Sequence, residues 1–76
     1  MTILREKQYR EDGVIISTVS VPFLAWYGLF ETGISFNNGK NWHIAEGYND
    51  DVDAVIGHGR YCAMSKEELE KLTFIG

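Results

Sequence analysis

His58 and Cys62 are the two residues of this chain whose types could support nucleophilic chemistry. A thiol nucleophile needs a histidine within hydrogen-bonding reach, and that histidine needs a third group to orient it. We expect Arg60 to Met64 to form a short strand, in which residues four apart are separated by more than about 12 Å. A small enzyme that uses His58 and Cys62 is therefore the third hypothesis, and we assign no catalytic residue.

Metal binding would have to draw on a small set of side chains: His43, His58, Cys62, Asp50, Asp51 and Asp53. Structural zinc sites usually combine closely spaced pairs of cysteine and histidine, whereas His58 and Cys62 form a single such pair. Calcium loops space their oxygen ligands around a glycine in mid-loop, which the segment 50–53 lacks. The sequence therefore predicts no metal and no cofactor.

The segment Gly57-His58-Gly59-Arg60 suggests a ligand role. Two glycines in a loop can present consecutive amide groups to an anion, and an arginine beside them can clamp it. The alternative function is thus a small-molecule or anion-binding domain, with His58 and Arg60 as ligand-binding residues and Trp42 or Tyr48 as an aromatic wall. The competing interpretation is an ordinary loop, since phosphate-binding loops carry longer signatures than this segment.

Acidic side chains outnumber basic ones, 11 to 7, which gives a net charge of −4. Because this sign opposes the phosphate attraction that supplies most non-specific affinity for nucleic acids, we expect no direct nucleic-acid binding. The acidic residues could instead occupy the basic groove of a nucleic-acid-binding protein, as small inhibitors from viruses or mobile elements often do. The candidates for this contact are Glu46, Asp50, Asp51 and Asp53. The competing interpretation is a solvated acidic face.

Ten aromatic residues are more than a core of 76 residues can comfortably enclose. Aromatic side chains left at a surface are favoured anchors of protein interfaces, although all of them could equally belong to the core. We predict that Trp26, Tyr27 and Phe30 contribute to such an anchor. The leading hypothesis is therefore a small acidic, non-catalytic module that binds another protein or forms a homodimer.

Length and cysteine content limit the organisation of the chain. Residues 1–76 are expected to form a single domain, since two halves would each be too short to bury a core. Cys62 is the only cysteine, and charged residues at positions 5–7 replace the apolar region of a signal peptide, so we expect a cytoplasmic protein. The uncharged run Val14 to Phe30 is interrupted by Pro22 and Gly28 and is expected to form a soluble core, not a membrane span.

Two turn signals divide the first half of the chain, Glu11-Asp12-Gly13 and Asn37-Asn38-Gly39, and each predicts a β-hairpin. Thr2 to Tyr9 is expected to pair with the β-branched run Val14 to Val21. A charged helix over Arg5 to Asp12 is the alternative for the first of these segments.

The length of the second loop decides which side chains are buried, because a one-residue slip reverses both faces of a hairpin. A three-residue loop with Gly39 in the left-handed conformation pairs Ile34 with Trp42 and Thr32 with Ile44. We predict this register because it gathers the large apolar groups on one face, and it turns Ser35, Asn41 and His43 outward. A two-residue turn would instead pair Ser35 with Trp42 and Gly33 with Ile44.

The remaining segments predict helices. Pro22 to Phe30 favours a short helix or an irregular crossover followed by a strand from about Leu29, although this run could instead be a buried strand. Asn49 to Ile56 predicts a short helix closed by Gly57, and Ser65 with Glu68 predicts a capping box that begins the last helix. The predicted fold is α+β: a small antiparallel sheet of four or five strands with two hairpins, packed against a C-terminal α-helix and a short central helix or crossover.

Overall fold

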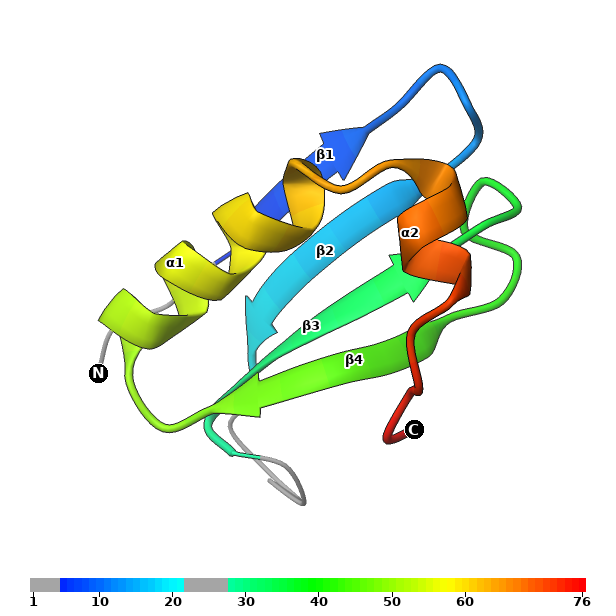
Figure 1. The fold of residues 1–76 in the computed structure, drawn as a ribbon. Coiled ribbons are helices and arrows are strands. Elements are labelled where there is room, and N and C mark those ends of the chain that lie inside the picture. The colour runs from blue at the N-terminus through cyan, green and yellow to red at the C-terminus, as the bar shows by residue number, and fades with distance from the viewer. Residues whose placement is uncertain (1–4, 22–27) are drawn as a thin grey trace.

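The computed structural model describes residues 5–21 and 28–76, which form one antiparallel sheet and two helices (Figure 1). The strands follow the order β1-β2-β3-β4 in the sheet, so each pairs with its neighbour in sequence. The predicted α+β class with two hairpins is confirmed. In chain order the elements are β1 (Arg5–Tyr9), β2 (Ile15–Ser20), β3 (Phe30–Ser35), β4 (His43–Tyr48), α1 (Asp51–Cys62) and α2 (Lys66–Glu70).

Both helices lie on the same face of the sheet (Figure 1). The main core cluster joins Val14, directly before β2, and the strand residues Ile16 and Ile34 to Tyr61 of α1 and Leu69 of α2. A smaller cluster lies beside it and contains Phe30, Tyr48 and Ala54. Within the described ranges, no helix is long and apolar enough to cross a membrane.

The first hairpin forms as expected, because β1 pairs with β2 and places Lys7 opposite Ser17. The alternative of a helix over Arg5 to Asp12 is therefore wrong. Gly13 adopts a φ of 84°, which a glycine accepts without strain at the turn. The predicted strand residues 2–4 and most of the predicted central helix or crossover, residues 22–27, lie outside the described residues.

The predicted register of the second hairpin is wrong. Ile34 pairs with His43 instead of Trp42, and Gly33 pairs with Ile44 as in the register we disfavoured. Side-chain hydrogen bonds widen the loop: the Ser35 hydroxyl accepts the Gly39 amide at 2.7 Å, and Asn37 Oδ1 accepts the Asn41 amide at 3.0 Å. These bonds stabilise a longer loop than the turn signal alone indicates. Gly39 does adopt the expected left-handed conformation.

A β-bulge in β4 changes the register again further from the loop. Thr32 pairs with Glu46 although its neighbour Gly33 pairs with Ile44, so Ala45 is the additional residue. Ala45 packs against the core. Beyond this bulge the strand alternates regularly again, and the side chains of Glu46 and Tyr48 both lie on the helix side of the sheet. The bulge thereby re-aims two polar side chains toward α1.

The new register exchanges two predicted environments. Ser35, expected outward, is buried, whereas Trp42, expected in the core, is partly exposed. The Trp42 ring lies over Gly33, on the face of the sheet that points away from the helices. A Cβ atom added at position 33 would lie in van der Waals contact with this ring, at 3.4 Å.

Helix α1 differs from the prediction at both ends. Asp50, not Asn49, is the N-cap, and its carboxylate accepts the Asp53 amide at 2.8 Å. The helix continues through Gly57 to Cys62, so the strand expected over Arg60 to Met64 is wrong. Burial of Tyr61 in the main core cluster favours continuation of the helix past the glycine.

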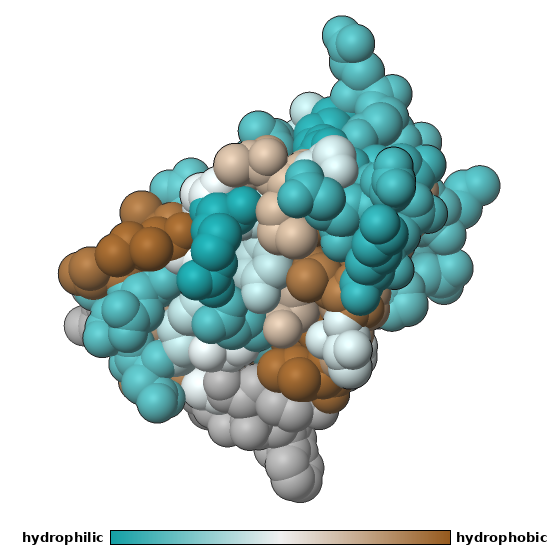
Figure 2. All heavy atoms as spheres, viewed as in Figure 1, coloured by the Kyte–Doolittle hydropathy of each residue, from teal (hydrophilic) through white to brown (hydrophobic). Residues whose placement is uncertain are grey.

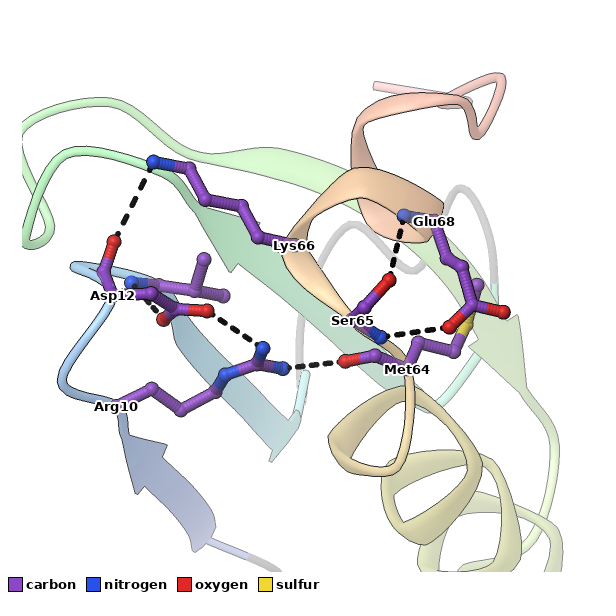
Figure 3. A network of polar contacts seen from close by, with 7 residues as sticks. Arg10, Asp12, Met64, Ser65, Lys66 and Glu68 are labelled. Atoms are coloured by element: carbon purple, nitrogen blue, oxygen red, sulfur yellow. Dashed lines mark hydrogen bonds and ion pairs between the residues drawn. The ribbon is translucent and has the colours of Figure 1, made fainter.

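The predicted capping box at α2 is confirmed: the Ser65 hydroxyl accepts the Glu68 amide, and the Glu68 carboxylate accepts the Ser65 amide. Figure 3 shows the hydrogen bonds that join the link between α1 and α2 to the turn of the first hairpin. The Arg10 guanidinium donates to the Met64 carbonyl and to the Asp12 carboxylate, both at 2.7 Å. The β1–β2 turn and the α1–α2 link are thus held together.

The C-terminal residues run beside β4. The Ile75 amide donates to the Ile44 carbonyl at 2.9 Å, and the Ile44 amide donates to the Gly76 carbonyl at 3.0 Å. The Phe74 ring stacks on His43 with a centroid separation of 4.8 Å. This segment covers part of a strand edge that would otherwise expose unpaired backbone groups.

Candidate functional site

The solvent-facing side of α1 is apolar. Val52, Val55 and Ile56 are 63%, 51% and 62% exposed, and Figure 2 shows them as a brown patch over this helix. Gly59 and Ala63 continue the same side at helical spacings of three and four residues. We call these five residues the outer face of α1.

This arrangement is the reverse of an ordinary surface helix, which turns its aliphatic side chains toward the core. The buried side of α1 consists of Ala54, Gly57 and Tyr61. Gly57 is required there because the Tyr48 ring, which rises from β4, occupies the place of a Cβ atom. Every branched aliphatic side chain of α1 therefore points to solvent.

Three of the predicted partner-binding residues lie in one turn at the start of α1. Asp50 caps the helix, and Asp51 and Asp53 belong to its first turn. Carboxylates are favoured at this end because the helix dipole places partial positive charge there. Val52 lies between them, so the acidic turn borders the outer face of α1 directly.

Glu46, the fourth acidic candidate, lies across a cleft from that turn. Its carboxylate accepts hydrogen bonds from Arg60 at 2.6 Å and from the Tyr61 hydroxyl at 2.9 Å. The cleft encloses about 290 Å³ between β4 and α1, and Asp53, Ile56 and Arg60 line its α1 side. Burial and the Glu46 hydrogen bond raise the pKa of Tyr61 to about 12, so its hydroxyl remains a donor to this carboxylate.

The predicted loop Gly57 to Arg60 is instead the interior of α1. In an α-helix the amides of these residues bond to carbonyls four residues earlier, so they cannot be presented to an anion. Arg60 retains an exposed guanidinium, whose pKa is raised by the Glu46 charge. Anion binding by this segment would therefore depend on the side chain of Arg60 alone.

His58 and Cys62 are one helical turn apart, closer than the predicted strand would allow. His58 Nδ1, however, lies 2.7 Å from the Thr18 hydroxyl, and burial lowers the pKa of this histidine. Burial also raises the pKa of the Cys62 thiol, which disfavours the thiolate that nucleophilic catalysis requires. This chemistry gives no support to the enzyme hypothesis.

The His58 contact is the end of a buried polar chain beneath α1. Thr18 and Thr32 face each other on β2 and β3 with their hydroxyls 2.6 Å apart, and Thr32 lies 2.9 Å from the Tyr48 hydroxyl. Each of these hydroxyls can donate once and accept once along the chain. The network satisfies polar groups that sit between the sheet and the helix.

The predicted aromatic anchor is only partly described. Phe30 is buried with Tyr48 and Ala54, so it is not available at the surface, and Trp26 and Tyr27 lie outside the described residues. On the open face of the sheet, the described residues line a hollow of about 300 Å³. Its lining includes Trp42, Ile44, Lys7, Ser17 and Gly33.

Comparison with protein-family models, with curated proteins and with solved structures gave no match to this chain. Within residues 5–21 and 28–76, no three histidine, cysteine or acidic side chains come together as a metal site would require. The outer face of α1, which sequence reasoning missed, was visible as the spacing of positions 52, 55 and 56. That spacing by itself would have predicted a buried stripe.

Proposed function

We propose that this protein is a non-catalytic protein-binding module that docks through the outer face of α1. The observation that carries this proposal is the exposure of Val52, Val55 and Ile56 as one continuous stripe. Exposed apolar patches rimmed by polar groups are typical of interaction surfaces, and burying such a patch against a partner is favourable.

The charges beside the stripe restrict the partner. Asp51 and Asp53 make no ion pair within the described part of the chain, so they are available to basic groups. A matching surface is apolar at its centre and carries a basic side chain at its edge. Inhibition of a nucleic-acid-binding protein is one form that this function could take, since such proteins present basic surfaces.

Capture from the cells that produce the protein, with the wild-type chain and two variants as bait, tests this proposal. We expect one stoichiometric protein partner, and we expect Val55→Glu to weaken its binding at least about tenfold by placing a charge in the apolar stripe. Tyr9→Glu is the matched control, because Tyr9 is 71% exposed on β1, away from the outer face of α1. Both variants should keep the wild-type circular dichroism.

Loss of binding in Tyr9→Glu with full binding in Val55→Glu would move the docking surface to the sheet and contradict the proposal. Equal binding by all three chains would also contradict it. We expect the working compartment to be reducing, such as the cytoplasm, since Cys62 is the only cysteine of the sequence.

A further inference from the structure

We propose that the partner of the outer face of α1 is a second copy of this chain, with the two α1 helices packed antiparallel about a two-fold axis between Val55 and Ile56. The inference rests on the proposed function, because it uses the same docking surface and names its occupant. Closed two-fold pairing requires a patch that is complementary to itself. The outer face of α1 meets this requirement in shape and in charge.

The shape follows from the order of residues along the helix. A two-fold axis between positions 55 and 56 places Val55 opposite the partner's Ile56, and Val52 opposite the partner's Gly59. An added Cβ at Gly59 would meet no atom of its own chain within 4 Å, so the space above this glycine is open. A branched valine side chain can therefore lie over the bare backbone, which permits the close approach that helix packing needs.

The same two-fold axis also brings opposite charges of the two copies together. Asp53 and Arg60 are two helical turns apart and lie on one side of α1, since both line the cleft beside β4. The two-fold operation brings each Asp53 to the partner's Arg60, with an offset of only about 3 Å along the helix axis. Arg60 also donates to Glu46, but its guanidinium carries five donor hydrogens and can serve both carboxylates.

The size of the surface sets the strength of the dimer. One face of a twelve-residue helix is smaller than the area that stable interfaces bury, so we expect a weak and concentration-dependent association.

The test is sedimentation equilibrium of the full chain from about 10 μM to about 1 mM. We expect wild type to shift from monomer to dimer, and Asp53→Arg and Arg60→Asp each to weaken association at least about tenfold by opposing like charges at both ends of the interface. An equimolar mixture of these two variants should associate again, because a mixed dimer restores both arginine–aspartate contacts. Glu70→Arg and Lys71→Asp, at the C-terminal end of α2, make the same charge changes as controls and should behave as wild type.

Wild type that stays monomeric throughout this range would overturn the inference. So would a mixture that associates no better than either single variant, or self-association that Val55→Glu leaves unchanged. A monomeric wild type that still captures another protein, with capture lost in Val55→Glu, would overturn the dimer alone and leave the proposed function supported.

Discussion

Two glycines of α1 occupy opposite environments although only one residue separates them. Gly57 faces the sheet, where the ring of Tyr48 fills the space that a methyl group would need. Gly59 faces solvent with no atom near its missing Cβ. Glycine is therefore required at position 57, whereas at position 59 it only lowers the stability of the helix.

We predict opposite effects of alanine at these positions. Gly57→Ala should lower the free energy of unfolding by about 1–3 kcal/mol, because Tyr48 must move. Gly59→Ala should raise it by about 0.5–1 kcal/mol, because alanine favours the helix. Chemical denaturation at about 1 μM, where α1 is unpaired, measures both effects. Destabilisation by Gly59→Ala would show that this side of α1 is covered.

His58 makes the stability of the fold depend on pH. Burial lowers its pKa from the ordinary value of 6.5, so the folded state prefers the neutral ring. As pH falls below about 6.5, the unfolded chain takes up the proton first, and stability decreases until the lower folded-state pKa is passed. In the protonated ring Nδ1 carries a hydrogen, so the Thr18 hydroxyl must then accept this hydrogen bond.

We therefore expect the stability of wild type to fall between about pH 7.5 and pH 5 more steeply than that of His58→Gln. Urea denaturation at several pH values in this range measures the difference. Parallel curves for the two proteins would show that His58 contributes nothing to the pH dependence. Arg5→Gln, an exposed change on β1, serves as the control for altered charge.

At the scale of elements, α2 depends on its cap. This helix has five residues, too few to be stable by themselves, and the box of Ser65 and Glu68 satisfies two of its free amides. The hydrogen bonds at Ser65 also lower the pKa of the Glu68 carboxyl. The cap in turn holds Leu69, which is fully buried in the core.

Ser65→Ala should destabilise the protein by about 1 kcal/mol, and Ser65→Asn should recover most of this loss because asparagine also caps helices. Thermal and urea unfolding of the three proteins provide the comparison. An alanine variant as stable as wild type would mean that packing of Leu69 positions α2 without the cap.

The bulge at Ala45 is the other decisive local feature. With regular alternation, a strand that directs His43 to the helix side would direct Glu46 away from it. The additional residue reverses this alternation, and Glu46 reaches Tyr61. The cleft beside α1 exists because of one irregular residue in β4.

At the scale of the molecule, one arginine joins segments that are far apart in sequence. Arg10 bonds to the Met64 carbonyl 54 residues away, and to Asp12 in its own turn. Lys66 approaches the Asp12 carbonyl from the other side at 3.5 Å (Figure 3). The position of both helices over the sheet therefore depends on this junction as well as on the core.

We predict that Arg10→Met lowers the free energy of unfolding by about 1–2 kcal/mol, because the Met64 carbonyl and the Asp12 carboxylate lose a charged donor. Arg5→Met, the same substitution at an exposed position of β1, should have little effect. Equal stability of the two variants in urea denaturation would show that the junction contributes nothing to the fold.

Local signals in the sequence were sufficient for the strands of the first hairpin, the left-handed Gly39, the acidic first turn of α1 and the Ser65 cap. The turn and the caps depend on contacts among residues within about four positions of one another, and the strands of the first hairpin on the β-branched residues that flank its turn. The candidate site was predicted to the same extent: Asp51 and Asp53 lie at a helix start as expected. The sequence did not indicate whether Val52, Val55 and Ile56 would lie on the buried or on the solvent-facing side of α1.

Only the tertiary structure decided the register of the second hairpin and the length and orientation of α1. Gly57 and Gly59 locally disfavour a helix by about 1 kcal/mol each, which is why the sequence predicted its end there. Burial of Tyr61 and the close approach of Tyr48 to Gly57 outweigh that preference. Ala54 and Gly57 face the sheet together with Tyr61. The aliphatic side chains of α1 therefore face solvent, where they are available for a partner.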